Sequence, residues 1–172
     1  MSKTLTLLFS ILIGLNITSC RTTKITKKQN YMNSLYNELK DTFPDANVII
    51  KNDSIKLYFS NNILFETGST VIKSEFNELL LSMSNALKKF NKTNLLIIGH
   101  TDSVGELGFN ETLSKSRANS VKSWLIINQI DSNRVKTWGM ANKEPIDTNN
   151  TAEGRTKNRR VEFIILYKEE RN

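Results

Sequence analysis

The sequence has few of the residues on which much catalytic and metal chemistry depends. Its 172 residues include one histidine and one cysteine. Metal sites built from several histidines or cysteines therefore lack their ligands, and we expect neither a metal nor a cofactor. Two prolines and seven glycines also argue against a fibrous or low-complexity chain. The composition predicts an ordinary folded domain.

The length and charge leave the class of partner open. A chain of 172 residues has room for one domain and a leader segment. The formal net charge of +7 would suit nucleic acid, an anionic membrane surface or an acidic glycopolymer. The same lysines could equally form solvated faces with no partner.

The first nineteen residues have the layout of a signal peptide. Lys3 precedes a mostly apolar run over residues 5–17, and Cys20 follows shortly after it. The run is shorter than the roughly 20 residues that cross a bilayer as a helix. Cys20 has no second cysteine to pair with inside the chain, so it is free, paired between chains or chemically modified.

The residues before Cys20 favour modification. The stretch ITSC at residues 17–20 resembles the lipobox of bacterial lipoproteins. That resemblance implies cleavage before Cys20 and acyl chains such as palmitate on it; an ordinary secretory signal is the alternative. Arg21 follows the cysteine, which favours sorting to the outer membrane, with the rest of the chain facing the periplasm.

The remaining chain divides into three segments. Residues 20–30 are polar and basic and are expected to form the lipidated N-terminus and a flexible tether. Residues 31–54 should hold a first helix and strand, because Met32, Leu35 and Leu39 repeat at helical spacing and Pro44 ends the pattern. The folded domain proper is expected over residues 55–168.

Hydrophobic periodicity predicts the elements of this domain. Residues 48–50 and 55–59 suggest a hairpin, 76–90 a helix, and 95–98 a central strand buried on both faces. A second helix should begin at Asn110 as its N-cap and run to about residue 128. Strands over 135–138 and 161–167, joined by a loop over 139–158, complete an α+β layer sandwich, with helices on one face of a small mixed sheet.

Two charged residues do not fit this scaffold. Asp102 follows the strand at 95–98 and is expected to be exposed at its end, where ligand groups often lie. Arg117 falls on the inward arc of the second helix, between Leu113 and Val121. A buried guanidinium needs a carboxylate or a ligand. A structural Asp102–Arg117 salt bridge, or an Arg117 that reaches water past apolar neighbours, explains the pattern as well as a binding site does.

Three separated motifs resemble the OmpA-like C-terminal domain. They are GHTDSVG at residues 99–105, FNETLSKSRANSVKSWL at 109–125 and GRTKNRRVEF at 154–163. The family pattern is roughly G-H-T-D-x-x-G, then N-x-x-L-S-x-x-R-A, then N-R-R-V. The family's F-D-x-x-S segment reads FETGS at 65–69 here. The layout also resembles peptidoglycan-associated lipoproteins, but their usual L-G-E-R-R-A reads LSKSRA at 113–118, so no Tol-system partner is implied.

The resemblance implies non-covalent binding of peptidoglycan. Asp102 matches the family aspartate that meets the ammonium of diaminopimelate, and Arg117 matches the arginine that meets its carboxylate. Matching positions that would shape the pocket are Thr101, Asn110, Leu113 and Arg159; of Arg159 and Arg160, only one should face the site because they alternate along a strand. Asp102 and Arg117 should then share a cleft without pairing tightly with each other. The chain would then tether the outer membrane to the cell wall, and envelope proteins would be further partners. The alternative is an envelope scaffold or a protein-interaction module that binds the wall weakly or not at all.

Two other functions are disfavoured. An enzyme is not expected, because the single His100 reads as a structural residue and Cys20 belongs to the leader. Nucleic-acid binding would rest on net charge and the basic residues at 155–160, which have no interleaved aromatic side chains for base stacking.

Overall fold

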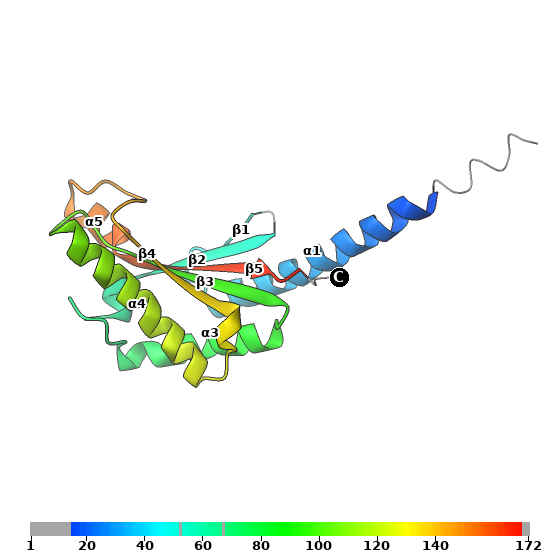
Figure 1. Cartoon of the computed structure of the whole chain (residues 1–172), viewed down its shortest axis with the longest axis horizontal. Coiled ribbons are helices and arrows are strands. Elements are labelled where there is room, and N and C mark those ends of the chain that lie inside the picture. Colours follow the sequence, from blue (N-terminus) through cyan, green and yellow to red (C-terminus); the bar gives the residue numbers. More distant parts are fainter. Residues whose placement is uncertain (1–14, 52, 67, 170–172) are drawn as a thin grey trace, which may run out of the picture.

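The fold is built on one five-stranded mixed sheet. A computed structural model describes the backbone of residues 15–51, 53–66 and 68–169, and side chains only from residue 27 onward within these ranges. The strand order is β1-β2-β5-β3-β4, with β3 and β4 parallel and the other neighbours antiparallel (Figure 1). The strands are β1 Ile49–Lys51, β2 Ser54–Ser60, β3 Thr93–His100, β4 Val135–Ala141 and β5 Arg160–Tyr167.

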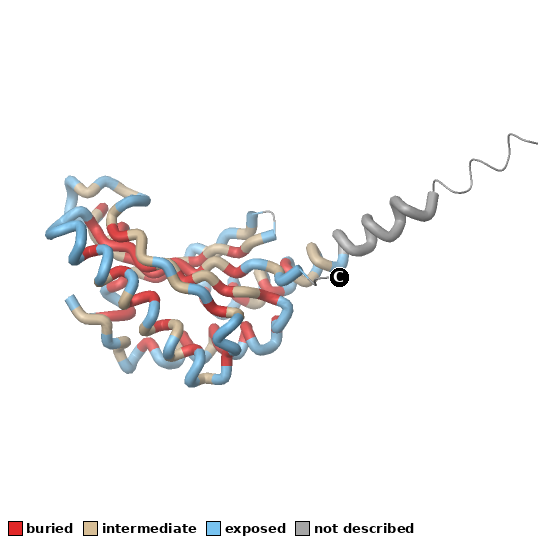
Figure 2. Tube along the Cα trace, in the orientation of Figure 1, coloured by how far each residue is buried: buried red, intermediate tan, exposed pale blue. Residues whose placement is uncertain are grey.

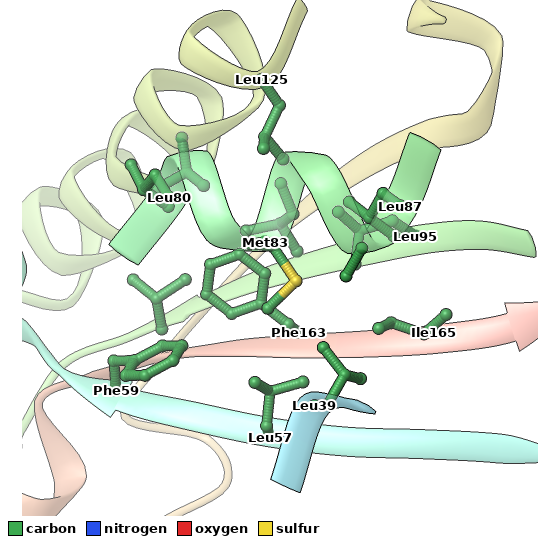
Figure 3. Packing of buried hydrophobic residues seen from close by; sticks show 14 of the residues in the cluster. Leu39, Leu57, Phe59, Leu80, Met83, Leu87, Leu95, Leu125, Phe163 and Ile165 are labelled. Atoms are coloured by element: carbon green, nitrogen blue, oxygen red, sulfur yellow. The ribbon is translucent and has the colours of Figure 1, made fainter. Parts of the chain in front are cut away.

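Three longer helices cover one face of this sheet. They are α1 Leu15–Thr42, α3 Asn77–Lys89 and α4 Leu107–Ile127; the short helices are α2 Asn61–Leu64, α5 Ala152–Asn158 and the 3-10 turns η1 Ser74–Phe76 and η2 Ser132–Arg134. On the covered face the register places Phe163 between Leu57 and Ile97. All three side chains are fully buried. Figure 3 shows Leu80, Met83 and Leu87 of α3 and Leu125 of α4 packed over the strands. The predicted α+β sandwich is confirmed.

No helix of the described residues packs over the opposite face of the sheet. Burial therefore alternates along β3, where Leu96 and Ile98 are only partly buried. Figure 2 shows buried and partly buried residues mixed along the strands of the sheet. The expectation that this strand is buried on both faces was wrong. A continuous apolar run cannot reveal whether a second layer of helices covers it.

The first helix docks through the predicted apolar positions. Met32, Leu35 and Leu39 are at most 1% exposed, and each such burial stabilises the fold by roughly 1.5–3 kcal/mol. The helix ends at Thr42, just before Pro44. Residues 21–30, expected to be a flexible tether, instead lie within α1. A polar segment without proline or glycine extends an existing helix at little cost, because nucleation has already taken place.

Helix α4 lies unusually close to the parallel strands. A Cβ added to Gly99 of β3 would lie 2.0 Å from the Ser114 carbonyl oxygen, and one added to Gly139 of β4 would lie 2.7 Å from the Lys115 nitrogen. Only glycine permits such an approach. These two positions set the depth at which α4 presents its side chains at the end of the sheet.

The predicted leader stays outside this description. Residues 1–14 and the side chain of Cys20 are not among the described parts of the chain, so the signal peptide and lipid anchor remain predictions. Within the helices that the structure does describe, none combines the length and apolarity needed to span a membrane.

Candidate functional site

A pocket of about 530 Å³ opens at the end of the sheet where β3 ends and β5 begins. Its walls are formed by the loop after β3, the first half of α4, helix α2 with the segment that follows it, and α5. All six predicted site residues line it, although they come from three separate motifs. The full lining is Asn61, Asn62, Phe65, Glu66, Gly68, Thr101, Asp102, Val104, Phe109, Asn110, Leu113, Arg117, Arg155 and Arg159.

Asp102 forms the acidic side of the pocket. Its Oδ2 accepts a hydrogen bond from Arg159 Nη1 at 2.6 Å, and its Oδ1 accepts one from the Val104 backbone nitrogen at 3.1 Å. The residue is 8% exposed, so the expectation of an exposed strand-end carboxylate was wrong. The arginine covers it, and that partner lies 57 residues away in sequence.

Arg117 forms the basic side and is 5% exposed, as its place on the inward arc of α4 predicted. Its Nε donates to the Ser69 carbonyl oxygen at 3.0 Å, and its guanidinium carbon lies 5.4 Å from the centre of the Phe65 ring. Among the described residues, its two terminal nitrogens have neither a hydrogen bond nor a carboxylate partner. Burial lowers the pKa of Arg117, the positive charge of Arg159 lowers it further, and Asp102 raises it.

The predicted relation between Asp102 and Arg117 is therefore confirmed. They line one pocket and do not form a salt bridge with each other. The alternative of a structural Asp102–Arg117 pair does not hold, because Asp102 pairs with Arg159 and Arg117 contacts a backbone carbonyl and an aromatic ring.

Arg159 and Arg160 point to opposite sides, as strand alternation predicted. Arg159 lines the pocket and also donates from Nη2 to Thr156 Oγ1 at 2.7 Å. Arg160 is 1% exposed and binds Glu162 Oε1 through Nη2 at 2.6 Å, away from the pocket. The buried Arg160–Glu162 pair thus fixes this end of β5, while the neighbouring Arg159 faces the pocket.

The remaining predicted residues shape the loop and the wall. Asn110 is not the N-cap of α4: the helix begins three residues earlier, with Glu106 at the cap position. The Asn110 Nδ2 instead donates to the Val104 carbonyl at 2.9 Å, which fastens the loop after β3 to the helix. Thr101 is buried and Leu113 partly buried, and both line the pocket.

Sequence patterns missed part of the site. The loop expected over residues 139–158 contains α5, which carries Arg155 and is capped by Thr151 Oγ1 accepting from the Gly154 nitrogen at 3.1 Å. Thr151 followed by Glu153 in the first turn is a helix-start signal that could have indicated it. The roles of Phe65 and Ser69 beside Arg117 carried no such signal, because these contacts join residues about 50 positions apart.

His100 is fully buried and does not line the pocket. Its Nε2 lies 3.6 Å from Glu162 Oε1. Among the described residues, no hydrogen bond or ion pair joins His100 to Asp102.

Known proteins resemble this chain in both sequence and fold. A protein from Escherichia coli K12 named "Probable lipoprotein YiaD" is 36% identical over 137 residues, which is 78% of this chain and 63% of that protein. The peptidoglycan-binding protein ArfA of Mycobacterium bovis is 35% identical over 98 residues, 57% of this chain and 30% of its own length. The chain thus spans less than two thirds of either relative.

A solved structure matches most of the fold. The cell wall anchor of the type VI secretion system from Pseudomonas aeruginosa is 33% identical, has a TM-score of 0.68, and covers 78% of this chain and 97% of its own. The OmpA family model matches residues 64–159, which include all the residues that line the pocket except Asn61 and Asn62. The chain belongs to the OmpA family.

Proposed function

We propose that the pocket binds, without catalysis, the free end of the diaminopimelate residue in a peptidoglycan stem peptide. That end carries one ammonium and one carboxylate. Asp102 would accept hydrogen bonds from the ammonium, and the planar guanidinium of Arg117 would donate to the carboxylate in a bidentate geometry. The name of ArfA and the description of the Pseudomonas wall anchor support this ligand class.

The environment of Arg117 carries this proposal. A guanidinium that is 5% exposed, with both terminal nitrogens unpaired among the described residues, bears a desolvation cost without compensation from a carboxylate. A ligand carboxylate in the adjoining pocket would supply that compensation. The stacked Phe65 ring would hold the guanidinium plane in place meanwhile.

The Asp102–Arg159 pair is compatible with ligand binding. A carboxylate has about four acceptor positions, and Asp102 uses one for Arg159 and one for the Val104 nitrogen. An ammonium could therefore bind without displacing Arg159. Arg159 would then act as a positioning residue that fixes the rotamer of Asp102.

At the level of the cell, the chain would tether the outer membrane to the wall. Acyl chains on Cys20 would hold the membrane, and the domain would face the periplasm; the lipoprotein and outer-membrane relatives support this placement. A second candidate is an envelope interaction module with no wall binding. It is favoured by exposed apolar side chains on the open face of the sheet, notably Trp138 at 59% and Leu166 at 41% exposure.

Co-sedimentation with insoluble sacculi containing diaminopimelate distinguishes the two. The full chain in detergent should pellet with sacculi, and Asp102→Ala and Arg117→Ala should each weaken binding by at least about tenfold, since each leaves a ligand charge unpaired. Glu111→Ala and Lys143→Ala are matched controls: they remove one charge of each sign from an exposed pair 2.7 Å apart outside the pocket. Equal pelleting of all five proteins would reject the site, and no pelleting of wild type would favour the interaction module.

A further inference from the structure

The charged side chains of the pocket do not balance. Its lining contains two acids, Asp102 and Glu66, and three arginines at 117, 155 and 159. Asp102 and Arg159 neutralise each other at 2.6 Å. Glu66 is 72% exposed at the side chain and lies 3.4 Å from Lys73 Nζ. Within the described chain, the pocket therefore holds two guanidiniums, Arg117 and Arg155, without a carboxylate partner.

Arg155 is positioned to reach the same ligand as Asp102 and Arg117. It lies in α5, four residues before Arg159, which is the C-cap of that helix. Both side chains line the pocket. Its Nη1 donates to the Asn149 carbonyl at 2.9 Å. Among the described residues, its Nε and Nη2 donate no further hydrogen bond to the protein.

Arg155 is not needed to hold the neighbouring loop. The side chain of Asn158, which is fully buried, accepts from the Ile146 and Asp147 nitrogens at 2.9 and 3.0 Å. Its Nδ2 donates to the Asp147 carbonyl at 2.8 Å and to Asn149 Oδ1 at 3.0 Å. Four bonds from one buried residue fix the loop, so the single bond from Arg155 to the same loop is additional.

We propose that Arg155 binds a second carboxylate of the same peptide, so that the pocket selects stem peptides carrying two free carboxylates. This inference rests on the proposed function. The free end of diaminopimelate is zwitterionic and adds no net charge, so it pairs with Asp102 and Arg117 and leaves Arg155 unpaired. A second carboxylate in reach of Arg155 would give this guanidinium the counter-charge that it lacks among the described residues.

Two groups of the stem peptide could supply this carboxylate. One is the α-carboxylate of the isoglutamate that precedes diaminopimelate, and the other is the main-chain carboxylate that ends the peptide after it. Amidation removes the charge from either group while keeping its size. Arg155 would thus be a specificity-determining residue that discriminates amidated from unamidated peptide.

Three soluble peptides test the proposal by titration into the full chain in detergent. They are the stem tripeptide with both groups free, the same peptide with the isoglutamate α-carboxylate amidated, and the same peptide with its terminal carboxylate amidated. Wild type should bind one of the two amides about three- to tenfold more weakly, the range expected for a partly exposed charge-assisted hydrogen bond. Which amide is weaker identifies the source of the carboxylate.

Variants separate this role from a structural one. Arg155→Gln should bind the free peptide and the discriminated amide equally, whereas Arg155→Lys should keep part of the preference. Lys157→Gln is the matched control, because it removes the same charge from the same helix at a side chain that is 62% exposed and outside the pocket. A loss of affinity for all three peptides by one common factor would indicate structural damage and would overturn the proposal.

The outcomes also separate this inference from the proposed function. Wild type could bind the free peptide but show no preference between it and the amides, or Arg155→Gln could keep that preference. Either result rejects the second-carboxylate site and leaves the proposed binding of diaminopimelate by Asp102 and Arg117 intact. If wild type binds none of the peptides, both are rejected.

Discussion

Replacing Glu162 by glutamine perturbs the buried charge cluster beside the binding pocket. Glu162 lies on β5 and is 1% exposed. Its Oε1 accepts from Arg160 Nη2 at 2.6 Å and Nε at 2.9 Å, and its Oε2 lies 2.7 Å from Lys56 Nζ. The amide of Glu162→Gln would leave the buried Arg160 without its counter-charge. Removing one partner of a buried pair typically costs about 3–5 kcal/mol of unfolding free energy.

The pKa of Glu162 gives a second measure of the same interaction. Burial alone would raise this pKa, but His100, Lys56 and Arg160 outweigh burial and lower it from 4.5 to about 2. A depressed carboxyl pKa stabilises the fold above the unfolded-state value, and that stability is lost as the pH falls towards the folded value. The loss should amount to about 3 kcal/mol between pH 4.5 and about 2.

Urea unfolding at a series of pH values measures both effects. At neutral pH, Glu162→Gln should be about 3–5 kcal/mol less stable than wild type, and its stability should fall less steeply below pH 4.5. Adding Arg160→Met should recover part of the loss, because the unpaired charge is then removed. A variant that loses under about 1 kcal/mol, or one with the wild-type acid profile, would refute the assigned charge cluster.

Two further substitutions test the packing that supports the pocket. Gly99→Ala would place a Cβ 2.0 Å from the Ser114 carbonyl oxygen, so α4 must shift. We expect the free energy of unfolding, measured by thermal unfolding, to fall by at least about 3 kcal/mol. The control is Gly108→Ala, whose Cβ would meet only a side-chain oxygen at 3.5 Å and whose stability should stay near that of wild type. Arg134 Nε and Nη2 donate to the Thr93 carbonyl and to carbonyls at the end of α3. Arg134→Met should therefore lower the free energy of unfolding, measured in urea, by about 2–3 kcal/mol. A loss under about 0.5 kcal/mol would contradict this role.

Local patterns were sufficient for most of the fold. Apolar residues at helical spacing, such as Met32, Leu35 and Leu39, predicted a helical face that is indeed buried. The short β-prone runs at residues 55–59 and 161–167 predicted β2 and β5, which pair in register from Ser54 to Ser60. The open face of the sheet could not be predicted in this way, because it depends on where the helices pack in three dimensions. The helical character of residues 21–30 was missed because a polar segment has no periodicity to detect.

The site was predictable only in part, for a related reason. Arg117 was identified because a charge on an apolar arc violates a local pattern, and Asp102 because it follows a strand. Their actual partners are contacts across the chain: Arg159 for Asp102, and Phe65 and the Ser69 carbonyl for Arg117. Such contacts leave no trace in local spacing. Only the resemblance of separated motifs brought Arg159 into the predicted set, and Arg155 emerged from the three-dimensional charge balance.

Displacement by free diaminopimelate is the most direct test of the proposal that Asp102 and Arg117 bind the free end of this residue. Wild-type chain bound to sacculi should be released into the supernatant as meso-diaminopimelate is added, while Nα-acetyl-lysine amide, which has a side-chain ammonium but no carboxylate, should release much less. Arg117 would be the residue that makes this distinction, because it lines the pocket and its terminal nitrogens have no partner among the described residues. Release by Nα-acetyl-lysine amide and by diaminopimelate at equal concentrations, or retention of the chain at saturating diaminopimelate, would contradict the proposed binding of diaminopimelate by Asp102 and Arg117.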